Sequence, residues 1–154
     1  MPNTYSQLYI QIVFAVRGRQ NFITSHIREE TQKYISGIIA ENKQKLYAIY
    51  CMPDHVHILV SMQPNIAVSD LVRNIKANSS AWIKNKFHGL SSFAWQEGFG
   101  AFSYSKSQAQ QVVHYILNQP EHHRKKTFKE EYIAFLDAYE IKFDDRYLFE
   151  FYDE

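Results

Sequence analysis

The sequence predicts an α+β fold of the ferredoxin-like, split βαβ type, in which an antiparallel sheet carries two helices on one face. Segments with strand and helix patterns follow one another in the order strand, helix, strand, strand, helix, strand. Only Pro53-Asp54 separates the second strand from the third, and so short a connection indicates a hairpin with antiparallel pairing. With both helices on one face, the other face of the sheet is expected to remain open for a ligand or a partner.

The N-terminal part supplies the first strand and the first helix. Residues 5–16 alternate in polarity like a strand, which ends at the glycine-marked turn Arg17-Gly18-Arg19. A helix then runs to about Asn42, with Ser25 as its expected N-cap and isoleucines on its inner face. Residues 46–52 form the second strand, so this region is expected to be structural.

A pair of histidines marks the third strand, over residues 56–60. Because side chains alternate faces along a strand, His55 and His57 project to the same side. Two imidazoles on a rigid strand suit one metal ion with further positions open for water or substrate. Alternatively, one histidine caps the strand and the other is an ordinary core residue, and a motif this short leaves both possibilities open.

The second helix, from about Val68 to Phe87, has an apolar face and a polar, mostly basic stripe on another face. Such a stripe either follows a nucleic-acid backbone or is an ordinary hydrated surface. The two arginines of the turn after the first strand allow the same two interpretations. The candidate DNA-binding residues are therefore Arg17, Arg19, Arg73, Lys76 and Lys84.

The region after the second helix supplies a fourth strand and a third helix. The strand is expected in the later part of residues 93–105, where Gly98 and Gly100 permit a bulge or a close backbone approach. The helix begins near Ser107 and should end or kink close to Gln119, because Pro120 follows.

One tyrosine and one glutamine of this third helix are candidates for chemistry. Tyr115 and Gln119 lie one helical turn apart, on the flank of the apolar stripe rather than inside it. On its own, Tyr115 would be interpreted as a tyrosine at the boundary of the core. Its distance of four residues from Gln119 distinguishes it from the other ten tyrosines.

The C-terminal region begins with a polar, basic link, residues 121–126. Its adjacent histidines, His122-His123, are expected to be solvated or near phosphate rather than to form a metal pair. Thr127 and Glu130 fit a capping box for a last helix to about residue 139, and an acidic, aromatic tail follows.

Composition indicates a single domain over residues 1–154, expected to be a cytoplasmic protein. No apolar run approaches the roughly 20 residues that a membrane span needs, and the single cysteine excludes an internal disulfide. Charge is unevenly distributed. Residues 1–126 hold 14 Lys and Arg against 7 Asp and Glu, whereas residues 127–154 hold 3 against 9. A basic body is what a ligand with a phosphate backbone requires, although short segments also fluctuate in charge.

A histidine pair, a tyrosine hydroxyl with a nearby amide, and a basic body suggest phosphodiester chemistry. A metal would polarise the scissile phosphate and stabilise charge on the transferring group. A phenol is a weak nucleophile near neutral pH because its pKa is near 10, so phosphate coordination must supply much of the activation. Attack by tyrosine would leave a covalent phosphotyrosine, which allows a strand to be rejoined without ATP.

Three segments together resemble a known family. They are the His-hydrophobic-His motif in Met52-Pro53-Asp54-His55-Val56-His57, the segment Trp95–Ser103, and Tyr115-Ile116-Leu117-Asn118-Gln119. Their order and spacing resemble the single-tyrosine HUH transposases of the smallest bacterial insertion sequences, the insertion-sequence 200/605 type. The resemblance runs from Leu8 to the final helix.

The resemblance implies a homodimeric transposase specific for single-stranded DNA with hairpin ends. Carried over, His55, His57 and Gln119 bind Mg²⁺ or Mn²⁺. Tyr115 is then the nucleophile that forms a 5′-phosphotyrosine and releases a 3′-hydroxyl. The family also implies active sites assembled in trans, with the histidines from one subunit and the tyrosine helix from the other.

Three other functions compete with this one. A histidine-triad nucleotide hydrolase would need a third histidine at position 59, which is Leu59. A non-enzymatic module that binds single-stranded nucleic acid would use exposed aromatic residues of the sheet but leave the histidine pair without a role. A domesticated relative that cuts repeat hairpins would carry the same catalytic residues, so only the flanking DNA would separate it from a mobile transposase.

Overall fold

The structure is a computed structural model that describes residues 3–144, 146 and 148. Its centre is a four-stranded sheet in which every neighbouring pair of strands is antiparallel. The spatial order is β2-β3-β1-β4, which confirms the predicted α+β, split βαβ arrangement. The strands are β1 (Tyr9–Ala15), β2 (Lys45–Met52), β3 (His55–Ser61) and β4 (Gly100–Tyr104).

Two long helices, α1 (Ser25–Glu41) and α2 (Val68–Lys86), cover one face of the sheet. Their apolar stripes meet the even-numbered side chains of β3, including Val56 and Ile58, in the main hydrophobic core. Burial of this face fixes the register of β3, because a slip of one residue would turn its other face inward. The histidines of β3 therefore face the opposite side of the sheet.

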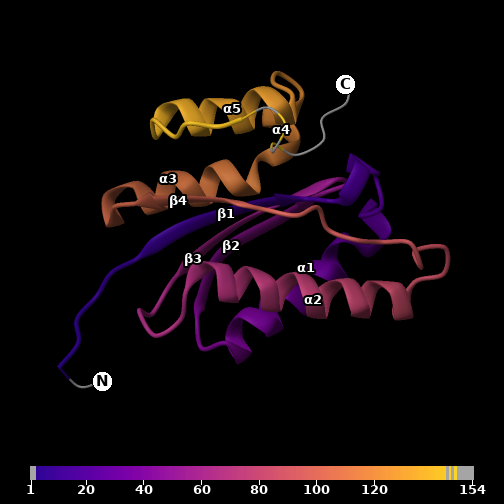
Figure 1. Cartoon of the computed structure of the whole chain (residues 1–154), viewed down its shortest axis with the longest axis horizontal. Helices are drawn as coiled ribbons and strands as arrows, with labels where there is room; N and C mark the ends of the chain where they lie inside the picture. Colours follow the sequence, from indigo (N-terminus) through magenta and orange to yellow (C-terminus); the bar gives the residue numbers. More distant parts are fainter. Residues whose placement is uncertain (1–2, 145, 147, 149–154) are drawn as a thin grey trace.

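That opposite side is not open, contrary to the sequence-based expectation. Three helices lie over it, namely α3 (Lys106–Leu117), the short α4 (Gln119–His123) and α5 (Phe128–Ala138) (Figure 1). The apolar stripe of α3 needs a surface to bury, and Val112 and Ile116 find it in a second cluster with Leu59 of β3. The sheet is thus sandwiched between two helical layers.

Some boundaries differ from those expected. The turn Arg17–Arg19 is a short 3-10 helix, and Thr24 rather than Ser25 precedes α1 as its N-cap. The link over residues 121–126 is partly helical, because Pro120 lies in the first turn of α4, where its missing N–H costs nothing. The capping box of Thr127 and Glu130 is confirmed at the start of α5. Most of the acidic tail, residues 144–154, lies outside the described residues.

No helix within residues 3–144 is both long and apolar enough to cross a lipid bilayer.

Gly100 allows α5 to dock on β4. A Cβ atom at this position would lie 2.8 Å from the hydroxyl of Tyr132 and 3.0 Å from the Phe102 ring. Tyr132 is itself only 6% exposed, so its ring has little room to move away. The close approach expected for this glycine is therefore the contact that lets the C-terminal helix lie over the histidines of β3.

Candidate active site

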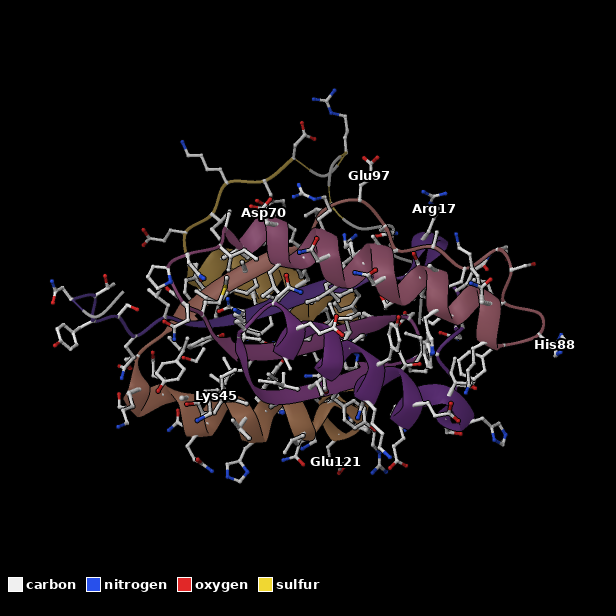
Figure 2. All side chains as sticks on the ribbon, turned by 90° about the horizontal axis from the view of Figure 1, so that it is seen from below. Arg17, Lys45, Asp70, His88, Glu97 and Glu121 are labelled. Atoms are coloured by element: carbon white, nitrogen blue, oxygen red, sulfur yellow. The ribbon has the colours of Figure 1, made fainter. Side chains whose placement is uncertain are left out.

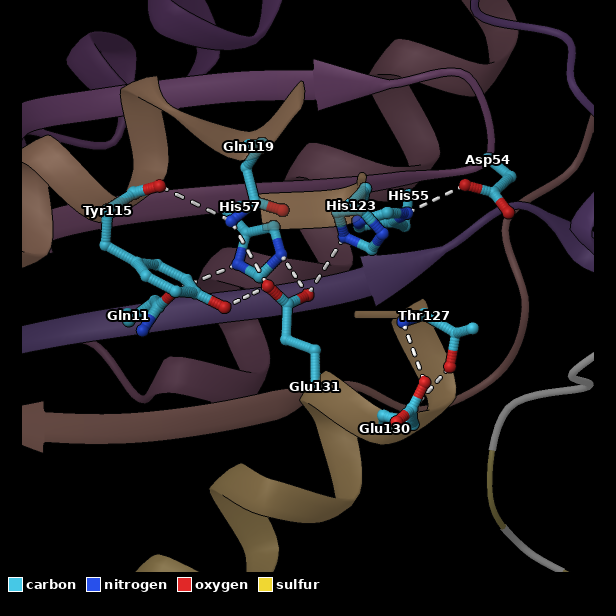
Figure 3. Close-up of polar contacts among 10 residues, drawn as sticks. All are labelled: Gln11, Asp54, His55, His57, Tyr115, Gln119, His123, Thr127, Glu130 and Glu131. Atoms are coloured by element: carbon cyan, nitrogen blue, oxygen red, sulfur yellow. Dashed lines mark hydrogen bonds and ion pairs between the residues drawn. The ribbon is translucent and has the colours of Figure 1, made fainter. Parts of the chain in front are cut away.

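The two histidines of β3 project together toward the layer formed by α3, α4 and α5. Their ring centroids are 5.3 Å apart, and the side chains are 1% exposed for His55 and 0% for His57. Although buried, they do not face a purely apolar interior. Figure 3 shows them among carboxylate, amide and phenol groups that come from both the sheet and the C-terminal helices.

Each ring is held by a hydrogen-bond partner on its Nδ1 side. Asp54 contacts His55 Nδ1 at 2.7 Å, and the amide oxygen of Gln11 contacts His57 Nδ1 at 2.9 Å. The Gln11 amide is oriented in turn, since its nitrogen donates to the Tyr104 hydroxyl at 2.8 Å. For His55 the acceptor at Nδ1 fixes the tautomer and leaves Nε2 as the ligand atom, the usual arrangement behind a metal-binding histidine, whereas His57 Nε2 also faces an oxygen acceptor, the Glu131 carboxylate.

Glu131 of α5 links the histidines to the tyrosine. One carboxylate oxygen lies 3.0 Å from His57 Nε2 and 3.4 Å from His123 Nε2. The other oxygen accepts hydrogen bonds from the Tyr115 hydroxyl and from the Gln119 amide, the latter at 3.2 Å. Tyr115 and His57 are thus bound to opposite oxygens of the same carboxylate, within one chain (Figure 3).

A divalent metal fits this site. The side chains of His55, His57, His123 and Glu131 each offer a ligand atom, and these atoms all lie within 4.8 Å of one another. Within the described part of the chain, the buried His55 Nε2, His123 Nε2 and Gln119 Oε1 make no hydrogen bond. Buried polar atoms without hydrogen bonds are costly, and a cation would satisfy these three. Imidazole and carboxylate ligands suit first-row divalent metals.

Burial controls the protonation of the site. Burial lowers the pKa of His55 to about 4, against the opposing effect of Asp54, so its ring is neutral at pH 7 and can bind a cation. Burial and the negative charge of Glu131 raise the pKa of the Tyr115 hydroxyl above its usual value. Burial alone would raise the pKa of Glu131, but the neighbouring histidines outweigh it and hold that pKa below its usual range.

Gln119 occupies the position expected of it. Pro120 does not turn its side chain away, because α4 begins at Gln119 and buries it completely beside Glu131. His57, Tyr115 and Gln119 therefore lie together within a single chain, whereas the resemblance implies that the histidines and the tyrosine helix come from different subunits. The metal-binding roles of His55, His57 and Gln119 and the nucleophilic role of Tyr115 remain predictions.

The basic stripe of α2 lies across the sheet from this site. Lys76 is not directed into solvent, because its ammonium group donates to the carbonyls of Gln96 at 2.7 Å and Gly98 at 2.6 Å. Arg73 pairs with Asp70 at 2.6 Å, and Lys84 is exposed.

The basic turn after β1 is described only in part. Arg17 points outward from the ribbon (Figure 2), whereas the side chain of Arg19 lies outside the described part of the structure.

Four members of the site are not predicted from sequence. Asp54 is interpreted as a turn residue, Gln11 as a strand residue, His123 as solvated or phosphate-contacting, and Glu131 as one of many acids of the C-terminal region. Only Glu131 has a usable sequence signal, because it lies four residues before Phe135 and so on the same face of α5; the structure shows it almost fully buried at 4% exposure. Acids so buried are rare unless paired.

The chain resembles known proteins over most of its length. A family model described as "Transposase IS200 like" matches residues 4–119. The ISDra2 transposase TnpA of Deinococcus radiodurans is 25% identical over 120 residues, which cover 73% of this chain and 84% of that protein. His123 and Glu131 both lie beyond the matched family region.

Two solved structures share the fold. A candidate transposase from Deinococcus radiodurans superposes with a TM-score of 0.61 at 21% identity, over 76% of this chain and 94% of that one. A REP-associated tyrosine transposase bound to a REP hairpin gives a TM-score of 0.60 at 18% identity, over 79% of this chain and 72% of that one. With the family model matched over three quarters of its residues, this chain belongs to the IS200-like transposase family.

Proposed function

We propose that this protein cleaves and rejoins single-stranded DNA through a 5′-phosphotyrosine on Tyr115, with the help of a divalent metal, Mg²⁺ or Mn²⁺. The observation that carries the proposal is the shared carboxylate. Glu131 binds His57 through one oxygen and Tyr115 through the other. The proposed nucleophile and a proposed metal ligand are therefore close enough to contact the same phosphate group.

The chemistry is a transesterification at phosphorus. The Tyr115 oxygen forms a bond to the scissile phosphorus, the bond from phosphorus to the 3′ oxygen breaks, and that oxygen takes up a proton and leaves as a 3′-hydroxyl, so the proton gained there balances the one lost by Tyr115. Glu131 already holds the hydroxyl hydrogen of Tyr115 and is the nearest acceptor for the proton that is lost. In the reverse step a 3′-hydroxyl attacks the phosphotyrosine and releases Tyr115, so no nucleotide cofactor is consumed.

The raised pKa of Tyr115 supports the proposal that a cation takes part in the reaction. Burial and the charge of Glu131 both disfavour the phenolate. A divalent ion held by His55, His57 and Gln119, with Glu131 beside them, would offset that charge and polarise the phosphate. His55 and His57 are held for this role by Asp54 and Gln11.

The substrate we propose is DNA with a hairpin near the cleavage site. The fold neighbour bound to a REP hairpin supports this choice. A domesticated endonuclease that cuts such hairpins without moving an element would use the same residues. The DNA beside the gene separates the two, because a mobile element carries imperfect palindromes at both of its ends.

For the active site, we propose assembly in cis in place of the trans arrangement that the resemblance implies. Tyr115 lies with its ring centroid 6.0 Å from that of His57 of its own chain, so a second subunit is not needed to complete the site. Homodimerisation stays a separate prediction, to be measured by light scattering.

The experiment is to incubate the protein and Mn²⁺ with a labelled single-stranded hairpin oligonucleotide and to look for a covalent adduct on a denaturing gel. Tyr115→Phe should abolish the adduct, and Tyr5→Phe, at an exposed tyrosine far from the site, is the control. Mixed His57→Ala and Tyr115→Phe subunits should not recover activity if the site is built in cis. An adduct that survives in Tyr115→Phe would overturn the proposal.

A further inference from the structure

A cleft of about 450 Å³ opens beside Tyr115, between α3, the segment after α4, and α5. Three aromatic side chains line it, those of Tyr115, His122 and Phe135, together with Glu131, Ala134 and Ala138. Two lysines, Lys125 and Lys126, also line it, and both are exposed. All of these residues except Tyr115 lie beyond the region matched by the family model.

The cleft exists because α5 presents small side chains there. Ala134 and Ala138 are one helical turn apart and lie on the same face as Glu131 and Phe135. Figure 1 shows α5 lying above α3, with α4 joining them at one end. A larger residue in place of either alanine would fill the space between the helices, so the small side chains of α5 keep the cleft open.

The walls suit a nucleobase. The rings of Tyr115 and His122 have centroids 4.3 Å apart and are tilted by 32°, and the Phe135 ring meets Tyr115 edge-on at 5.8 Å. Aromatic side chains that line a groove bind single-stranded nucleic acid by stacking on its bases, and nearby cations pair with its phosphates. Lys125 and Lys126 supply that positive charge, and neither forms an ion pair among the described contacts.

We propose that this cleft binds one nucleotide of the single-stranded DNA, the one that flanks the linkage attacked by Tyr115. The inference rests on the proposed function, because Tyr115 is both the nucleophile and a wall of the cleft. The base lies against His122 and Phe135, while Lys125 and Lys126 hold the adjoining phosphates. The cleft is thus the subsite that places the scissile phosphate in front of the Tyr115 hydroxyl.

The first test measures binding without cleavage. A short single-stranded oligonucleotide with one internal 2-aminopurine is added to the Tyr115→Phe protein, in which the ring at position 115 is retained. Stacking in the cleft should quench the fluorescence. A second substitution in the Tyr115→Phe protein, His122→Ala or Ala134→Leu, should abolish the quenching and weaken DNA binding roughly 10-fold, the order expected for one lost base stack. Ala77→Leu, at an exposed alanine of α2 on the far side of the sheet, is the matched control.

The lysines are tested by salt dependence. Lys125→Ala and Lys126→Ala should each lower the slope of log affinity against log salt by about 1, as for one lost phosphate contact. Lys33→Ala, on α1 across the sheet, should leave the slope unchanged.

The second test uses the unmodified protein and a cleavable hairpin oligonucleotide. An abasic site at one of the two positions flanking the mapped cut should slow adduct formation at least several-fold, whereas one placed five nucleotides away should not. The cleft does not bind the flanking nucleotide if substrates with an abasic site at either flanking position are cleaved normally and the fluorescence quenching survives in both cleft variants. In that case an adduct on Tyr115 would still support the proposed function. Quenching that depends on the cleft, with no adduct from any substrate, would support the cleft and overturn the proposed function.

Discussion

Replacing Glu131 with glutamine is the most informative perturbation of the site. The substitution keeps the shape of the side chain but removes its charge, and the hydrogen-bond partners of that carboxylate are His57, Tyr115 and Gln119. Hydrogen bonds to a charged group contribute about 1 kcal/mol more than neutral ones, so three such contacts amount to about 3 kcal/mol. Burying a neutral amide costs less than burying a carboxylate, which offsets part of that loss. We therefore expect the metal-free variant to be about 1–2 kcal/mol less stable.

The larger effect should appear when metal is added. Loss of a ligand or its support typically weakens metal binding about 10–100-fold. At saturating Mn²⁺ this removes about 1.4–2.7 kcal/mol of ligand-linked stabilisation. For a domain of this size that corresponds to roughly 3–10 °C in Tm.

The assay is thermal unfolding with and without Mn²⁺, together with titration calorimetry of the metal. Glu130→Gln is the matched control, because it makes the same change one residue earlier and glutamine can still complete the capping box with Thr127. If Glu131→Gln keeps the full Mn²⁺-dependent rise in Tm, the reasoning about Glu131 is refuted.

Three further predictions follow from burial at and around the site. Gly100→Ala should cost about 1–3 kcal/mol by overpacking and also reduce cleavage, because it pushes Tyr132 and α5 away from the sheet; unchanged melting would contradict this. Lys76→Met should lower Tm with little effect on DNA affinity, since the ammonium group of Lys76 donates hydrogen bonds to two carbonyls that methionine would leave unsatisfied, whereas Lys84→Met should leave Tm nearly unchanged. Because burial lowers the pKa of His55 to about 4, the unfolding free energy should fall by about 3 kcal/mol as the pH is lowered from 6.5 to 4 and then level off. Denaturant titrations at several pH values measure this; if the unfolding free energy of His55→Gln falls equally with pH, His55 is not the cause.

The sheet and its helices were predictable because their signals are local. The isoleucine stripe of α1, the alternation of β3 and the brief Pro53-Asp54 connection each define one element, and their order defines the sheet. The covering of the second face was missed because nothing in the spacing of α3 says which surface its apolar stripe will bury. Only the tertiary structure shows Val112 and Ile116 against Leu59.

The site was predictable only in part, for a related reason. His55 and His57 are two residues apart and Tyr115 and Gln119 four, so each pair follows from the periodicity of its own element. Glu131 reaches the site only because α5 folds back over β4, which requires the close contact between Gly100 and Tyr132, 32 positions apart in the sequence. Long-range docking of this kind leaves no short sequence motif.

The central claim is that Tyr115 becomes covalently bound to DNA at a site served by its own chain's histidines. The most direct measurement is mass spectrometry of the peptides from an Mn²⁺-dependent protein–DNA adduct. We expect a nucleotide attached through its 5′-phosphate to Tyr115. A nucleotide found on any of the other ten tyrosines, or cleavage that leaves no adduct on Tyr115, would contradict it.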